Sequence, residues 1–160
     1  MSTHQALVLT STSTPLSLQT LPIPTAASGS VVVKVLGTYI LPYISSVLNG
    51  KLPYHITLPL IPGASCIGRI HSLGPDAVSL QPGQLVYCDI TIRARDDPDA
   101  AILMGLHGGA APKLMEGDWR DGCFSEYAKF PLENVFRLDE EALCKESGYT
   151  VEDLCSIPCK

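Results

Sequence analysis

The sequence lacks several features that would place it in a familiar class of binding protein. It contains no cluster of Lys and Arg, and its formal net charge is −5, so it offers no electrostatic attraction to nucleic acid or an anionic membrane surface. No window approaches the roughly twenty apolar residues of a membrane span, and residues 1–7 have no basic flank leading into an apolar segment. We therefore expect a cytoplasmic protein that binds neither nucleic acid nor a membrane.

The six cysteines lack the spacing of a zinc knuckle or a redox motif. No two of them form a C-x-x-C pair. Because no signal peptide indicates an oxidising compartment, a disulfide framework is not expected. Cys66, Cys88 and Cys123 alternate with apolar residues as ordinary strand positions do. This pattern predicts buried, reduced thiols.

Alternating apolar residues and frequent turns are the main positive signal. The apolar fraction is 46% in a chain of 160 residues, which is enough for one core. One short helix is expected at residues 42–50, where Pro stands near the start and Asn-Gly ends the segment. Alternation and β-branched runs predict strands in residues 5–9, 16–21, 31–37, 85–90, 122–130 and 135–138, and small residues and Gly interrupt a further strand in residues 63–74. Many short strands with turns between them favour a small β-barrel.

Two segments depart from this pattern. Residues 91–121 are too long for an ordinary connection, and we expect them to form a functional loop or an inserted lobe. From Asp139 the chain becomes acidic and helix-permissive, and Thr150 followed by Asp153 predicts the capped start of a helix. We therefore divide the chain into a domain at residues 1–138 and a tail at residues 139–160.

Five motifs in order give the chain a resemblance to a known family. They are Val33-Lys34-Val35-Leu36-Gly37, then Leu60-Ile61-Pro62-Gly63 with Gly68, the Leu73-Gly74 turn, residues 78–86 with Gln84 in place of an Asp, and Gly122-Cys123-Phe124-Ser125-Glu126-Tyr127. Over roughly residues 5–158 the chain resembles the catalytic domain of the medium-chain dehydrogenases/reductases. This resemblance implies a mainly β, GroES-like, partly open barrel with a few short helices.

The chain departs from the zinc-dependent members of that family. Tyr39 stands where those members have a Cys, and Ala64-Ser65 stands where they have His-Glu. A phenol and a methyl group do not replace a thiolate and an imidazole as zinc ligands. Residues 91–121 also contain none of the cysteines of the structural zinc lobe. Leu41 falls near the position at which the alcohol dehydrogenases have the Ser or Thr that relays a proton. We expect no metal.

Zinc-free members of the family resemble quinone and enoyl reductases, which need a nicotinamide hydride and a shaped apolar pocket. By this resemblance the substrate-binding candidates are Tyr39, Ile40, Tyr43, Ala64 and Trp119. The catalytic candidates are Tyr39 and His107, because a phenol can hold a carbonyl oxygen and an imidazole titrates near pH 7. His107 could instead be an exposed loop residue, and Trp119 could plug one end of the barrel.

The nucleotide-binding half of the family is missing from the sequence. Gly105-Leu106-His107-Gly108-Gly109 is the one Gly-rich run, and it lacks the G-x-G-x-x-G spacing. No Rossmann domain follows, so the chain should bind no cofactor unless a partner supplies a domain for NADPH. The face left uncovered would form a homodimer or bind a partner protein, through residues Tyr39, Ile40, Tyr43, Tyr149, Val151, Leu154, Cys155 and Ile157.

Three functions are open from the sequence. The first is the substrate half of a zinc-free, NADPH-linked enone or quinone reductase. The second is a repurposed domain of secondary metabolism that isomerises, cyclises or eliminates a small natural-product-like molecule without a cofactor. The third is a non-catalytic partner subunit. The fold alone does not choose among them.

Overall fold

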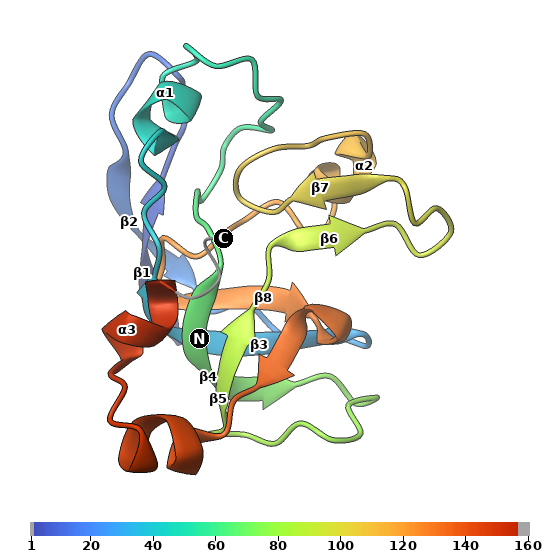
Figure 1. The fold of residues 1–160 in the computed structure, drawn as a ribbon. Coiled ribbons are helices and arrows are strands. Elements are labelled where there is room, and N and C mark those ends of the chain that lie inside the picture. The colour runs from blue at the N-terminus through green and yellow to red at the C-terminus, as the bar shows by residue number, and fades with distance from the viewer. Residues whose placement is uncertain (1, 157–160) are drawn as a thin grey trace.

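Strands dominate residues 2–156, the part of the chain that the computed structural model describes. Figure 1 shows the strands and helices in order. The strands are β1 (Thr3–Val8), β2 (Ser17–Pro22), β3 (Ser30–Thr38), β4 (Cys66–Leu73), β5 (Leu85–Cys88), β6 (Thr91–Arg93), β7 (Ala101–Leu103), β8 (Tyr127–Pro131) and β9 (Val135–Arg137). The helical segments are α1 (Ile44–Leu48), α2 (Pro112–Glu116), η1 (Leu132–Asn134), η2 (Glu141–Glu146) and α3 (Val151–Ser156). None of these helices has the length and apolarity needed to cross a bilayer.

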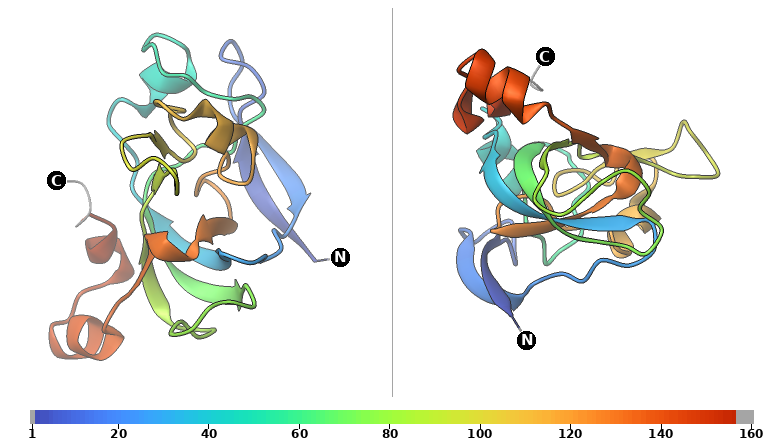
Figure 2. Two further views of the ribbon diagram at one scale, coloured as in Figure 1. Left: turned by 90° about the vertical axis from the view of Figure 1, so that its right-hand side faces the viewer. Right: turned by 90° about the horizontal axis from the view of Figure 1, so that it is seen from below.

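A five-stranded antiparallel sheet of order β8-β3-β4-β5-β9 forms the centre of the fold, and two hairpins, β1–β2 and β6–β7, flank it. The sheets do not close into a barrel, which confirms the prediction of a mainly β, partly open GroES-like fold. Figure 2 shows the β1–β2 hairpin, in blue, and the C-terminal helices, in red, at separate sides of the molecule.

The segment at residues 91–121 packs as a lobe on the main core. It contains the hairpin β6–β7 and the helix α2, and its buried side chains belong to the same apolar cluster as Val31 and Phe130 of the sheet. These buried lobe residues are Ile92, Ile102, Met104, Leu106 and Met115. Because the lobe contributes to the core, it is held rigidly enough to form one wall of a site.

Three glycines allow three backbone segments to pack closely at the base of that lobe. Gly63 donates its N–H to the Gly105 oxygen at 3.2 Å. A Cβ at Gly105 would lie 2.6 Å from the Gly122 Cα, and the Gly105 φ of +74° lies in the left-handed region. Side chains at these positions would force the segments apart. The glycines therefore anchor the lobe to the chain that leads into β4.

The strand predicted at residues 122–130 begins only at Tyr127. The residues before it bond to a different partner, because Gly122 donates its N–H to the Ile61 oxygen at 2.7 Å and Phe124 donates to the Pro62 oxygen at 2.9 Å. The predicted strand is therefore longer than the observed one, because residues 122–126 alternate in the sequence but pair irregularly.

The tail packs back on the sheet. Thr150 caps α3 as predicted, since the Asp153 N–H donates to the Thr150 Oγ1 at 3.2 Å and the Thr150 N–H donates to the Asp153 Oδ2 at 2.8 Å. Leu154 is 2% exposed and packs in a cluster with Ile67 and Leu85. The expectation that Leu154 faces a partner is therefore wrong, because its own chain buries it. Ile157 lies outside the described residues.

The predicted thiols are present in the core. Cys66, Cys88 and Cys123 are buried and free, and Cys66 faces Cys88 in the register between β4 and β5. Burial raises the pKa of the Cys88 thiol, which favours its protonated form. Cys159 lies outside the described residues.

Candidate functional site

Tyr39, Tyr43 and Ala64 line one cleft of about 680 Å³. Tyr39 follows β3 and Ala64 comes shortly before β4. These strands pair antiparallel, with Thr38 opposite Cys66, so the end of one strand and the approach to the other meet at the same edge. The structure thereby brings together three residues that the sequence analysis assigned to a site.

Ser65, Tyr87 and Asp89 also line this cleft, although the sequence analysis did not select them for a site. The Tyr87 hydroxyl lies 3.2 Å from the Ser65 Oγ and donates to it. A signal for them was present. Val86 and Cys88 are buried, so the alternation of a strand directs Tyr87 and Asp89 to the opposite side.

The remaining walls of the cleft are largely apolar. Leu41, which stands in the place of the proton-relaying hydroxyl residue, lines it together with Pro42, Ile90, Thr91, Leu103 and Leu106. Burial raises the pKa of Tyr43, and a hydrogen bond with Tyr54 raises it further. The Tyr43 phenol therefore stays protonated at neutral pH. The cleft combines apolar walls with hydroxyl groups that can donate hydrogen bonds.

Asp89 is the one Asp, Glu, Lys or Arg among the described residues that line the cleft. Its Oδ1 accepts the Thr91 N–H at 2.9 Å. The buried Asn134 side chain donates to the backbone oxygens of Asp89, at 3.1 Å, and Thr91, at 2.8 Å. In return, the Asp89 N–H donates to the backbone oxygen of Asn134 at 2.9 Å. This network holds the backbone of Asp89 in one position.

His107 takes part in a structural network instead of lining the cleft. Its Nδ1 accepts the backbone N–H groups of His55 and Gly109, each at 3.2 Å. Its ring stacks on Tyr54 with centroids 4.7 Å apart. An Nδ1 that accepts two hydrogen bonds requires the neutral tautomer with its proton on Nε2. A catalytic role for His107 stays a prediction, at a place apart from the residues that line the cleft.

Ile40 and Trp119 also lie outside the lining of this cleft. Ile40 follows Tyr39 but is 67% exposed. Trp119 packs against the main core, lines a separate pocket of about 340 Å³, and holds the Lys129 ammonium 5.8 Å from its ring centroid. The structure thus places the Trp119 ring at the base of the lobe, and substrate binding by either residue stays a prediction.

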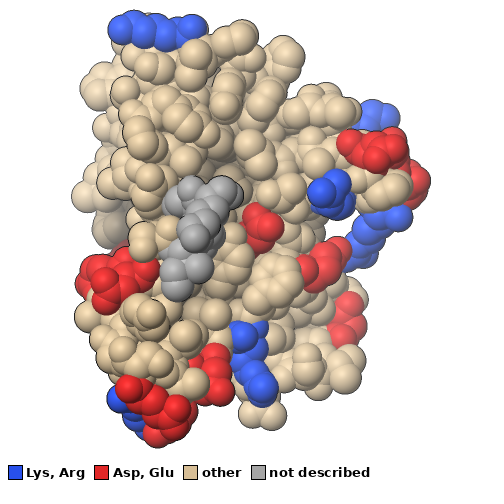
Figure 3. All heavy atoms as spheres, viewed as in Figure 1, with Lys and Arg blue, Asp and Glu red and all other residues tan. Residues whose placement is uncertain are grey.

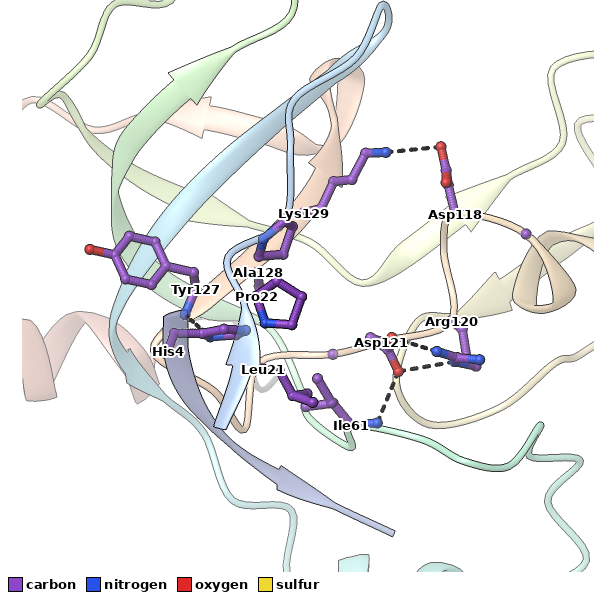
Figure 4. A pocket seen from close by; sticks show the side chains of 13 residues that line it. His4, Leu21, Pro22, Ile61, Asp118, Arg120, Asp121, Tyr127, Ala128 and Lys129 are labelled. Carbon is purple, nitrogen blue, oxygen red and sulfur yellow. Dashed lines mark hydrogen bonds and ion pairs between the residues drawn. The ribbon is translucent and has the colours of Figure 1, made fainter. Parts of the chain in front are cut away.

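A further pocket of about 350 Å³ is shown in Figure 4. Its charged groups pair with one another: Lys129 with Asp118 at 2.9 Å, and Arg120 with Asp121 at 2.9 Å. Asp121 also accepts the Ile61 N–H at 3.0 Å. The pair of Lys129 and Asp118 joins the lobe to β8 of the sheet. The Tyr39 cleft is the larger of the two pockets and has hydroxyl groups on its walls.

The donor set of the Tyr39 cleft does not fit a catalytic zinc ion. Zinc in proteins takes thiolate, imidazole and carboxylate ligands. Asp89 offers a carboxylate, but the other polar donors are hydroxyls of Tyr39, Tyr43, Ser65, Tyr87 and Thr91. Across residues 2–156, no three His, Cys, Asp or Glu residues form a group that could hold a metal.

The Gly-rich run does not offer the free N–H groups that bind pyrophosphate. Gly105 donates its N–H to the Arg120 oxygen, and Gly108 donates to the His55 oxygen. Leu106 and His107 both donate to the Leu103 oxygen, and Gly109 donates to the His107 Nδ1. Each N–H from Gly105 to Gly109 is thus already used within the chain.

Residues 27–140 match the family described as the alcohol dehydrogenase GroES-like domain. The chain belongs to this family, within the medium-chain dehydrogenases/reductases. The five-stranded sheet, the three close-packed glycines and the residues that line the Tyr39 cleft all fall within the matched residues.

The similar proteins are longer dehydrogenases. A zinc-type alcohol dehydrogenase-like protein of Schizosaccharomyces pombe is 25% identical over 71% of this chain, which spans 28% of that protein. An L-threonine 3-dehydrogenase of Streptomyces coelicolor is 28% identical over 96% of this chain, which spans 47% of it. The chain therefore covers less than half the length of these relatives.

Solved structures show the same fold. A thermostable alcohol dehydrogenase from Pyrobaculum aerophilum superposes with a TM-score of 0.73 at 16% identity, over 98% of this chain and 44% of that one. A dehydrogenase from Sinorhizobium meliloti, described as zinc-binding and bound to NADP, gives a TM-score of 0.71 at 23% identity, over 86% of this chain and 39% of that one.

Proposed function

We propose that this chain forms the substrate cleft of a zinc-independent, NADPH-linked reductase that acts on a small enone or quinone with an apolar body. The supporting observation is the composition of the cleft. At the two places where zinc-type relatives hold ligands, Tyr39 and Ala64 line a cleft that has apolar walls and donors of the hydroxyl type. Such a cleft can bind a carbonyl compound without a metal ion.

The chain's own residues have distinct tasks in this proposal. Leu41, Leu103 and Leu106 contact the apolar body of the substrate and exclude water. Tyr87 turns its hydroxyl proton from Ser65 to the carbonyl oxygen, whose negative charge grows as hydride arrives. Ser65 then donates its own proton to the Tyr87 oxygen. Tyr39 is a second donor to the same oxygen. When bound, NADPH supplies the hydride.

The proposal requires a nucleotide-binding domain that is joined to this chain or associated with it. The N–H groups of the Gly-rich run are occupied internally, and the chain spans less than half of its relatives. We therefore propose that the described residues provide the substrate side and that the nicotinamide is held elsewhere.

Binding of cyclohexenone, followed by nuclear magnetic resonance of the labelled chain without zinc, tests this function. We expect the amide signals of Tyr39, Ser65 and Tyr87 to shift together and to saturate. Ala64→Leu should fill the cleft and abolish these shifts, whereas Ala110→Leu, at an exposed position, should preserve them. Shifts confined to other regions would contradict the proposal. Turnover of the enone by the chain without nicotinamide would favour a cofactor-free isomerase or lyase instead.

A further inference from the structure

The charged side chain that lines the Tyr39 cleft is negative. Among the described residues that line it, Asp89 carries a carboxylate, and there is no Lys or Arg. Uncharged side chains cover much of the face shown in Figure 3, and Lys and Arg form no continuous patch there. A carboxylate in a partly enclosed cleft has a stronger effect on a bound charge than it has in bulk water.

Three aromatic rings accompany that carboxylate. Tyr39, Tyr43 and Tyr87 all line the cleft. Tyrosine rings attract cations through their electron-rich faces, and sites that bind quaternary ammonium groups combine such rings with negative charge. An anionic ligand would instead meet the Asp89 carboxylate with no basic side chain among the described lining residues to offset it.

We infer that the substrate of this cleft carries an ammonium group, which Asp89 and the tyrosines recognise; this inference rests on the proposed function and specifies its substrate class. The carbonyl end of the substrate lies at Tyr87 and Ser65, and the ammonium end lies at Asp89. Tyr87 and Asp89 line the same cleft, so one small amino ketone or amino enone can contact both.

The carboxylate is positioned for this task. One carboxylate oxygen of Asp89, Oδ1, accepts the Thr91 N–H at 2.9 Å. The Asn134 side chain donates to the backbone oxygens of both Asp89 and Thr91 and so fixes this segment. The structure records no hydrogen bond from a described residue to the other oxygen, Oδ2, which can accept from a ligand. Asp89→Asn keeps an oxygen for the Thr91 N–H and removes the charge alone.

The test compares two ketones of nearly equal shape, N,N-dimethyl-4-oxopiperidinium and 4,4-dimethylcyclohexanone, which differ in one permanent positive charge. Dissociation constants are measured by magnetic resonance titration of the full chain. We expect the cation to bind on the order of 10-fold more tightly than the neutral ketone. In Asp89→Asn the ratio of the two affinities should fall to about one.

Asp99→Asn is the matched control, because it removes an equal charge from an exposed position outside the cleft, and it should keep the preference. Equal affinity of the wild-type protein for both ketones would overturn the inference while leaving the proposed function intact. An equal loss for both ketones in Asp89→Asn would also overturn it. If neither ketone binds the folded protein, the proposed function fails, and the inference fails with it.

Discussion

The Tyr87 hydroxyl lies 3.2 Å from the Ser65 Oγ and donates to it, within the cleft that Tyr39 and Ala64 also line. Ser65 comes just before β4, and Tyr87 belongs to β5, which pairs with β4 through Cys66 and Cys88. Strand register therefore sets the separation of the two hydroxyl groups. Because the strands fix the Tyr87 ring, its hydroxyl has only to rotate its proton from Ser65 to a bound carbonyl oxygen.

Tyr87→Phe should weaken the binding of cyclohexenone about 5-fold, because one hydrogen bond contributes about 1 kcal/mol. The ring is retained, so its stacking on Phe136 and the folding of the chain should persist. Titration by magnetic resonance measures the change, with Tyr149→Phe on the exposed tail as the control. An affinity equal to that of the wild-type protein would remove Tyr87 from the proposed mechanism.

Gly105→Ala should destabilise the protein by about 2 kcal/mol or more. Its φ of +74° disfavours a side chain, and the new Cβ would press on the backbone of Gly122. Gly83 has a similar φ of +83° with nothing within 4 Å, so Gly83→Ala should cost only about 1 kcal/mol. Urea denaturation of both variants measures the difference. Equal losses would mean that the close packing of the three glycine segments adds no constraint.

The folding stability should fall as the pH drops below the usual pKa of histidine, because of His4. This residue is 3% exposed, and its Nδ1 accepts the Tyr127 N–H at 3.2 Å. Burial lowers its pKa from 6.5, and the nearby Glu126 opposes this effect. The unfolded chain therefore binds a proton that the folded chain excludes, so stability present above about pH 6.5 is lost below it.

His4→Asn tests this assignment, because the amide oxygen can replace Nδ1 as the acceptor without titrating. The decrease in urea midpoint between about pH 7.5 and pH 5 should be smaller in His4→Asn than in the wild-type protein. His55→Asn, at an exposed position, should retain the full decrease. Carboxylates such as Glu140, whose pKa Arg69 lowers, lose their contribution only in more acidic solution. An unchanged pH profile in His4→Asn would assign the effect to another group.

Leu154→Ala should destabilise the chain by about 2–4 kcal/mol, since it removes a buried side chain from the contact between α3 and the sheet. Leu18→Ala makes the same change at a position that is 68% exposed and should have little effect. Thermal unfolding by circular dichroism measures both. A small effect for Leu154 would mean that the tail leaves the sheet in solution.

The sequence predicted the strands of the central sheet, because alternation and glycine turns are local signals, but it did not predict the β6–β7 hairpin within residues 91–121. It also predicted the cap at Thr150, where the pattern of one hydroxyl and one carboxylate is contained in four positions. The position of Leu154 could not be obtained in this way. Whether a tail folds back depends on the sheet surface formed by Ile67 and Leu85, which are distant in the sequence.

The candidate site was predicted only in part. Tyr39, Tyr43 and Ala64 were found through the resemblance to the family, whose zinc ligands mark the cleft. Asp89 was not selected, because it comes just before residues 93–99, whose Asp and Arg residues are typical of a solvated loop. Strand alternation places Asp89 on the same side as Tyr87, but only the folded structure shows that this side lines the cleft with Tyr39.

The most direct test of the account is the zinc content of the protein after incubation with zinc and dialysis. The hydroxyl-rich donor set around Tyr39 and Ala64 predicts no stoichiometric zinc by elemental analysis, together with saturable binding of cyclohexenone in the cleft of the zinc-free protein. One zinc ion per chain, lost in Tyr39→Phe or Asp89→Asn, would contradict the claim that this cleft works without a metal.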